Sequence, residues 1–211
     1  MGNSTDFEKS MLRKDVKAFI KAIRNRDNAA VKKMLSEIPE LISATAKSPP
    51  KKDDGQSPLQ IAFKTGNFVA AGLLLKKGAD PNFMEESDVN EWNAPVLHDA
   101  IRATIFNCQA LGGSGFNTGV RLLKKLLKMG AEPRATDSYG NNCCMRAVLD
   151  ARQMIDHPNA HVGTVVKQMK AVFSLLSEYG ASFDEETETR ESAREALVNF
   201  GLEQYNLLPR T

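Results

Sequence analysis

A leucine-rich phrase that ends in glycine occurs three times in this chain of 211 residues, and this internal repetition constrains the fold more than any other feature. Each copy is an apolar stretch followed by a glycine, a small residue and a polar loop. Glycine directly after a helix adopts the left-handed conformation that ends it, because it has no Cβ to clash. The copies are LLLKKGADPN at residues 73–82, KLLKMGAEP at 125–133 and LLSEYGAS at 175–182, which predict helix ends at Gly78, Gly130 and Gly180.

A second phrase precedes each copy of the leucine-rich phrase. It reads GQSPLQIA at residues 55–62, APVLHDA at 94–100 and GNNCCMRA at 140–147. Ser57 and Asn142 are suited to cap the start of a helix, and Pro58 suits a first turn, where a missing N–H costs nothing. Alanines at the end of the phrase allow a second helix to pack closely. The two phrases together predict helix-turn-helix units.

With these two phrases, the chain resembles the ankyrin-repeat family. The family's sequence, G-x-T-P-L-H-x-A followed by a leucine-rich helix and G-A-D-x-N, is matched most completely at residues 55–82. The second copy keeps LHDA at 97–100, whereas the third has Cys143, Cys144 and Met145 in place of Pro-Leu-His. The resemblance implies an all-α solenoid of helix-turn-helix units with hairpin-like loops between them.

The spacing of the repeats departs from the family. The marker glycines lie 130 − 78 = 52 and 180 − 130 = 50 residues apart, against about 33 in an ordinary ankyrin unit. We assign the surplus to lengthened helices and to a longer loop at residues 83–93. The expected helices cover residues 95–108, 119–129, 143–155 and 162–179, with a break at 111–117.

These features predict a single domain over residues 1–211, made of about five units. Terminal units of a solenoid need a polar outer face, because each has a neighbour on one side only. Residues 15–46 are expected to form an N-terminal capping unit of two short helices that are separated near Arg26. A repeat at 53–90, extended repeats at 91–135 and 136–186, and a C-terminal capping unit at 187–211 follow.

The resemblance implies that a protein partner binds hairpin tips and the exposed faces of the first helices. Residues expected there are Phe83, Met84, Glu86, Trp92, Arg134, Asp137 and Tyr139 at the tips, and Ile61, Lys64, Asp99, Arg102 and Arg146 on the helices. Aromatic and arginine side chains dominate binding energy at interfaces. The predicted contact residues are therefore Trp92, Tyr139, Arg102, Arg134, Phe83 and Arg146. For Trp92, fixing its loop to the stack is an alternative role.

Catalytic chemistry has little support in the sequence. His157 and His161 have a spacing that occurs at metal sites, but Pro158 interrupts the helix this would need. The resemblance implies a structural, loop-bridging role for His98. The glycine-rich segment 112–115 lacks the Lys-Ser/Thr of a phosphate-binding loop. We therefore expect no catalytic residue, metal or cofactor; the alternative is a small enzyme, or a ligand- or metal-binding regulator, with a cleft beneath the lengthened helices.

Composition narrows the class of partner. The chain carries 28 Lys and Arg against 26 Asp and Glu, a net charge of +2 that is too balanced to indicate a nucleic-acid binder. Its three cysteines are a poor disulfide framework, its N-terminus lacks the apolar stretch of a signal peptide, and no apolar run approaches the length of a membrane span. A lysine ridge formed by Lys76, Lys77, Lys124, Lys125 and Lys128 would attract an acidic partner, although a solvated face is the simpler interpretation. We expect a cytoplasmic monomer that binds protein, without nucleic acid or membrane.

Overall fold

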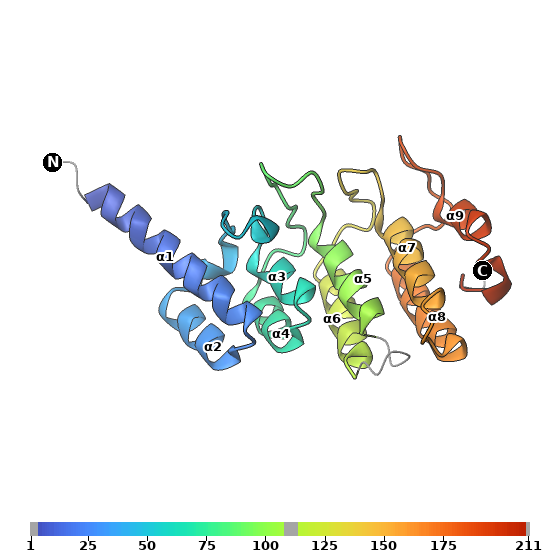
Figure 1. Cartoon of the computed structure of the whole chain (residues 1–211), viewed down its shortest axis with the longest axis horizontal. Helices are drawn as coiled ribbons and strands as arrows, with labels where there is room; N and C mark the ends of the chain where they lie inside the picture. Colours follow the sequence, from blue (N-terminus) through green and yellow to red (C-terminus); the bar gives the residue numbers. More distant parts are fainter. Residues whose placement is uncertain (1–3, 108–113, 210–211) are drawn as a thin grey trace. The chain divides into compact units, whose positions relative to one another are not determined.

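The computed structural model describes residues 4–107 and 114–209 (Figure 1). Within those ranges the chain forms α-helices and short 3-10 helices, and extended pairing is limited to two isolated β-bridges. The prediction of an all-α repeat fold is confirmed. The contacts divide the chain into two compact units: unit 1 comprises Met1–Asp80 and Glu85–Glu91, and unit 2 comprises Pro81–Met84 and Trp92–Thr211. The stacking of five units in one domain stays a prediction.

Unit 1 contains two helix pairs, α1 with α2 and α3 with α4. The helices are α1 (Ser4–Arg24), α2 (Asn28–Glu37), α3 (Pro58–Lys64) and α4 (Phe68–Lys77), with 3-10 helices η1 (Pro39–Ser43) and η2 (Lys51–Asp53) between the pairs. The predicted break near Arg26 is present, because the Asp27 side chain caps α2 by accepting a hydrogen bond from Ala30 N at 3.0 Å. However, α1 begins at Ser4, well before the predicted residue 15.

The start of α3 follows from the second phrase of the repeat. Ser57 accepts a hydrogen bond from Gln60 N, and the Gln60 side chain accepts one in return from Ser57 N, which makes a capping box. Pro58 occupies the first helical position, as predicted. The core of unit 1 is formed by residues such as Phe19, Ile23, Leu59, Phe63 and Leu74, each at most 1% exposed.

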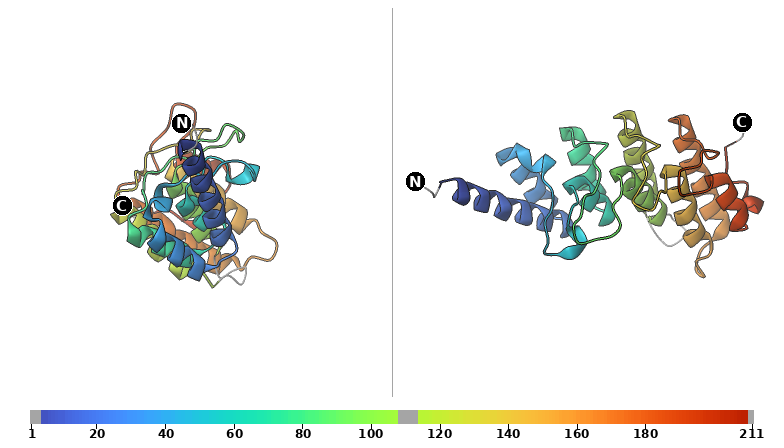
Figure 2. Two further views of the ribbon diagram at one scale, coloured as in Figure 1. Left: turned by 90° about the vertical axis from the view of Figure 1, so that its left-hand side faces the viewer. Right: turned by 90° about the horizontal axis from the view of Figure 1, so that it is seen from above.

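Unit 2 contains the lengthened helices. They are α5 (Val96–Phe106), α6 (Phe116–Lys128), α7 (Cys143–Ile155), α8 (Val162–Glu178) and α9 (Ala193–Asn199), and a 3-10 helix, η4 (Glu203–Tyr205), follows α9. The first helix of each pair packs against the second, α5 on α6 and α7 on α8. The views in Figure 2 also show α5 beside α7, so that first helices neighbour one another.

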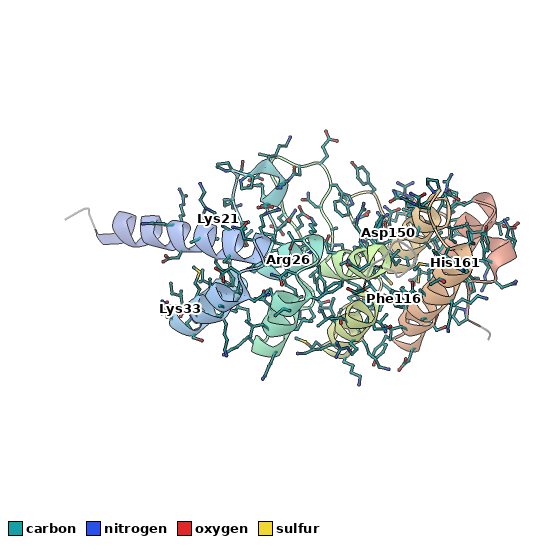
Figure 3. All side chains as sticks on the ribbon, turned by 60° about the horizontal axis from the view of Figure 1, so that its bottom comes forward. Lys21, Arg26, Lys33, Phe116, Asp150 and His161 are labelled. Atoms are coloured by element: carbon teal, nitrogen blue, oxygen red, sulfur yellow. The ribbon has the colours of Figure 1, made fainter. Side chains whose placement is uncertain are left out.

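The residues that end the helices behave as predicted. Gly78, Gly130 and Gly180 have φ of 92°, 92° and 87°, and Leu74, Leu126 and Leu176 are fully buried. The bounds of α7 agree with the prediction, whereas α6 starts at Phe116, before Gly119, because the Phe116 ring is buried in the first turn (Figure 3). The expectations that involve Cys108, Gly112 and Gly113 lie outside the described residues.

Candidate functional site

Three loops of unit 2 are joined side by side through hydrogen bonds. At the first joint, the indole Nε1 of Trp92 donates to Asp137 Oδ2 at 3.0 Å. Asn93 and Ser138 exchange two further hydrogen bonds: Ser138 N donates to the carbonyl of Asn93 at 2.9 Å, and Asn93 N donates to Ser138 Oγ at 3.1 Å. The segment 92–93 is therefore fixed to the loop 132–142.

A second joint links the loop 132–142 to the loop 184–191. Thr187 Oγ1 donates to the carbonyl of Gly140 at 2.8 Å, and Arg190 Nε donates to the carbonyl of Tyr139 at 2.9 Å. Arg134 forms an ion pair with Glu185, with 3.1 Å between Nε and Oε1. We call residues 92–93, 132–142 and 184–191 the hairpin row; its loops project from one side of the helices of unit 2 (Figure 1).

Asp137 organises the middle loop of the hairpin row from within. Its Oδ1 accepts hydrogen bonds from the backbone N–H groups of Tyr139 and Asn141, both at 3.0 Å, and the Asn141 side chain donates to Oδ2 at 2.9 Å. Burial acts to raise the pKa of this carboxyl, but the hydrogen bonds from Asn141 and Trp92 outweigh it, and the pKa is lowered. A buried, ionised Asp137 therefore holds the loop in one shape.

The hairpin row exposes some of the predicted contact residues and partly buries others. The Tyr139 side chain is 48% exposed and that of Arg134 is 71% exposed. Trp92 is half-buried, and its indole N–H fixes the loop, as the alternative role required. Phe83 is also half-buried, and its carbonyl accepts a hydrogen bond from Val96 N at 2.9 Å.

The two predicted arginines of the first helices meet at one buried carboxylate. Arg146 in α7 binds Asp150 through two hydrogen bonds, Nε to Oδ2 at 3.0 Å and Nη2 to Oδ1 at 2.6 Å. Arg102 in α5 approaches the same group at 3.7 Å and lies over the ring of Phe106. Burial raises the pKa of Asp150, against the lowering effect of Arg146 and Arg102. Asp150 is labelled in Figure 3.

The expectation that the first helices expose a broad face is wrong for three residues. Ile61, Asp99 and Arg146 are 0%, 1% and 8% exposed. Helix α3 buries six of its seven residues, Pro58 to Phe63, because neighbouring elements surround it. Arg102 keeps 43% of its side chain exposed, and it is the arginine of this pair that a partner can reach. The sequence analysis missed Asp150, although its i, i+4 spacing from Arg146 was a visible signal.

His98 is buried in α5 beside the hairpin row. Its side chain is fully buried, and Nδ1 lies 3.9 Å from Asp137 Oδ2, too far for a hydrogen bond. Burial lowers the pKa of His98 to about 4, although the nearby Asp137 carboxylate acts to raise it. The imidazole is therefore neutral at pH 7 and fills space between α5 and the loop 132–142.

The remaining candidates for chemistry are two histidines and two cysteines. His161 caps α8, with its Nδ1 accepting a hydrogen bond from Thr164 N at 3.4 Å, and His157 is exposed in the preceding turn. Cys143 and Cys144 are buried free thiols, and their mutual hydrogen bond together with burial raises the pKa of Cys143. Across the described ranges, no three His, Cys, Asp or Glu side chains are grouped to hold a metal ion.

The lysines of the predicted ridge are not all available to a partner. Lys124 in α6 donates to Glu178 in α8, with 3.0 Å between Nζ and Oε1. The hydrogen bond and the charge of Glu178 raise the pKa of Lys124. No helix of the described part of the chain is long and apolar enough to cross a membrane.

Residues 54–85 match a family model, Ankyrin repeat. The matched segment begins three residues before Ser57, the N-cap of α3, and extends beyond Gly78, which ends α4. No curated protein matches the chain.

Proposed function

We propose that this chain, an ankyrin-repeat protein, is a non-enzymatic module that binds a protein partner through the hairpin row of unit 2. Ankyrin repeats generally serve as protein–protein interaction modules. The observation that carries the proposal is the pair of hydrogen-bonded joints, Trp92 with Asp137 and Thr187 with Gly140, which hold three loops in one arrangement before a partner arrives.

A pre-ordered surface binds more tightly than a mobile one of the same area. Ordering loops on association costs free energy, and loops that are already fixed avoid that cost. The carboxylate of Asp137 accepts hydrogen bonds from both Trp92 and Tyr139, so two aromatic residues are held by one anchor. Rigid aromatic side chains on a fixed frame are the typical anchors of protein interfaces.

The six predicted contact residues take different roles in this proposal. Tyr139 and Arg134 are exposed and contact the partner directly. Trp92 and Phe83 offer half-buried rings at the edge of the hairpin row. On the neighbouring helices, Arg102 extends the contact surface, and Arg146 supports it from below by neutralising Asp150.

The experiment is an affinity capture with matched variants. The wild-type chain, Tyr139→Ala/Arg134→Ala and the control Val69→Ala/Arg121→Ala are immobilised, and captured proteins are identified by mass spectrometry. Val69 and Arg121 are exposed on α4 and α6 and belong to none of the loops of the hairpin row. We expect a protein that wild type and control retain and that the hairpin variant loses at least tenfold.

Two outcomes contradict the proposal. Equal capture by all three chains would place binding elsewhere. Capture of no protein, with a small molecule or metal ion co-purifying instead, would favour the alternative of an enzyme or ligand-binding regulator. A reducing, cytoplasmic setting and a monomeric chain are part of the proposal, and light scattering at micromolar concentration tests the monomer.

A further inference from the structure

The chain contains two Ser-Pro dipeptides, and the structure places them in opposite environments. Ser57 and Pro58 begin α3, where Ser57 is 5% exposed and its hydroxyl is engaged in the capping box. Ser48 and Pro49 lie in the segment KSPPKK, residues 47–52, which is exposed along its whole length. No exposed run of equal length occurs elsewhere among the residues whose exposure the structure describes. Of the two serines, Ser48 is the one that another protein can reach.

The residues around Ser48 match the substrates of one class of enzyme. Proline-directed serine/threonine kinases accept a hydroxyl that directly precedes proline, and members of this class favour a basic residue two positions after that proline. Kinases commonly select substrates by such charge patterns. Ser48 is followed by Pro49, and Lys51 occupies the favoured position, whereas Gln60 occupies it after Ser57. Exposure and sequence pattern therefore select the same serine.

The two prolines also keep this segment free of regular structure. Proline has no backbone N–H, so Pro49 and Pro50 donate no hydrogen bond to a helix or a sheet. Residues 47–50 belong to no helix and no strand. An exposed loop of this kind is the part of a folded chain that a modifying enzyme reaches most easily.

We propose that Ser48 is a phosphorylation site for a proline-directed serine/threonine kinase. A bond forms between Ser48 Oγ and the γ-phosphorus of ATP, the bond from that phosphorus to the β,γ-bridging oxygen breaks, and ADP leaves with the electron pair. The hydroxyl proton passes to the catalytic carboxylate of the kinase. The site lies in unit 1, outside the hairpin row, and does not rest on the function proposed above.

The modified residue adjoins a buried carboxylate that joins two loops of unit 1. Ser48 N donates to Asp54 Oδ1 at 2.7 Å, and Asp54 is 4% exposed. Asp54 Oδ2 accepts a hydrogen bond from Ser87 Oγ at 2.9 Å. The same Ser87 Oγ accepts hydrogen bonds from Val89 N and Asn90 N, at 3.1 and 2.9 Å. The loop 85–91 is therefore held to the loop 47–54 through Asp54.

A phosphate group on Ser48 would act on this joint through its charge. It carries about −1.5 to −2 charges at pH 7, and it repels a neighbouring carboxylate. The exposed Lys51 and Lys52 can pair with the phosphate in solvent and draw it away from Asp54. Both effects separate Ser48 N from the Asp54 carboxylate, so phosphorylation is expected to loosen the loop 85–91.

The first experiment treats the full chain with a purified cyclin-dependent kinase and ATP, and mass spectrometry of its peptides locates the phosphate. We expect phosphate on Ser48 and none on Ser57. Pro49→Ala should reduce the initial rate at least tenfold, and Lys51→Ala should reduce it several-fold. Ser36→Ala removes an exposed serine of α2 that precedes Glu37, and it should leave the rate unchanged.

The second experiment measures the effect on the loop 85–91 by hydrogen exchange. The amides of Val89 and Asn90 should exchange faster in the phosphorylated chain than in Ser48→Ala taken through the same treatment. The amide of Asn141, in unit 2, is the internal control and should exchange at the same rate in both.

The outcomes that contradict the proposal are distinct for its two parts. Absence of phosphate from Ser48, equal modification of Ser57, or an unaltered rate in Pro49→Ala would overturn the site. Equal or slower exchange at Val89 and Asn90 in the phosphorylated chain would overturn the effect on the loop. The affinity capture that tests the hairpin row involves neither Ser48 nor a kinase, so the two proposals fail separately.

Discussion

His98 makes the stability of unit 2 depend on pH. Its pKa falls from 6.5 to about 4 on folding, mainly through burial. Between these values the unfolded chain binds a proton that the folded chain does not, so the free energy of unfolding decreases as pH falls from 6.5 to 4. At about 1.4 kcal/mol per pH unit, the loss reaches roughly 3 kcal/mol. Urea unfolding at intervals of half a pH unit measures it.

The matched control for this pH dependence is His98→Gln. The variant lacks the titrating group, and its stability should change less between pH 6.5 and 4, even if it is lower throughout. Two carboxyl groups nearby are the same in both chains: the pKa of Asp137 is lowered from 3.8, so its contribution is lost only at lower pH, and the raised pKa of Asp150 adds a change of opposite sign that wild type and variant share. Equal slopes for wild type and variant would contradict the assignment.

Gly140 lies at a position that requires both a positive φ and space next to the Cα atom. Its φ is 78°, and a Cβ there would overlap Thr189 Oγ1. Gly130 has a similar positive φ, but a Cβ would meet nothing within 4 Å. We expect Gly130→Ala to cost ~1 kcal/mol and Gly140→Ala ~2–3 kcal/mol, since the latter adds a clash to the strain. Thermal unfolding compares them, and equal costs would contradict the joint between the loops.

The structural role of a single residue could be predicted from the sequence where its interactions are local. Ser57 and Asn142 cap their helices as expected, since a cap involves only the next three residues. The burial of Arg146 and the role of Asp150 were not predicted in this way. Arg146 is buried because Asp150 neutralises it and neighbouring elements cover both, and tertiary packing of that kind leaves little trace in the sequence.

At the scale of elements, we expect the loss of one hydrogen bond between loops to loosen the hairpin row as a whole. Trp92→Phe keeps an aromatic ring, smaller than the indole, but removes the N–H that donates to Asp137. A hydrogen bond to a charged group contributes about 1.5–3 kcal/mol, so we expect a loss of that order. The amides of Tyr139 and Asn141 should exchange faster in hydrogen-exchange mass spectrometry, because the same carboxylate holds them.

The control for this prediction is Tyr205→Phe in η4, which removes a polar group outside the hairpin row. Exchange in the loop 132–142 should be unchanged in that variant. Unchanged exchange in Trp92→Phe as well would show that Trp92 does not fix the loop.

Helices were predictable where their ends carry strong signals. Asn142 at the start of α7 and Pro158 after its end bracket the helix, and its bounds agree with the prediction. The start of α6 was placed too late, because glycines around residue 115 suggested a longer break than the buried Phe116 allows. The first residues of α1 were missed because no capping residue or periodicity was recognised there. The joints of the hairpin row depend on contacts between residues about 50 apart, which the repeat phrase does not encode.

At the scale of the whole molecule, the repeat phrases predict one solenoid, whereas the contacts define two compact units. The phrases specify the helix pair of each repeat, and their recurrence is enough to identify the fold. They do not specify the surface, since the side chains of Tyr139 and Val198 are exposed and lie outside the buried core. The partner is accordingly the part of the function least accessible from sequence.

The single tryptophan allows a test of whether the units unfold together. Trp92 lies in unit 2 and reports its unfolding by fluorescence, while circular dichroism reports all helices. Leu74 in unit 1 and Leu126 in unit 2 are both fully buried, and each Leu→Ala should cost ~2–5 kcal/mol. In a solenoid, stability is shared between neighbouring repeats. Leu74→Ala should therefore lower the urea midpoint of Trp92 fluorescence as well as that of circular dichroism. A fluorescence midpoint moved only by Leu126→Ala, with circular dichroism split into two transitions, would contradict the single domain and leave two independent units.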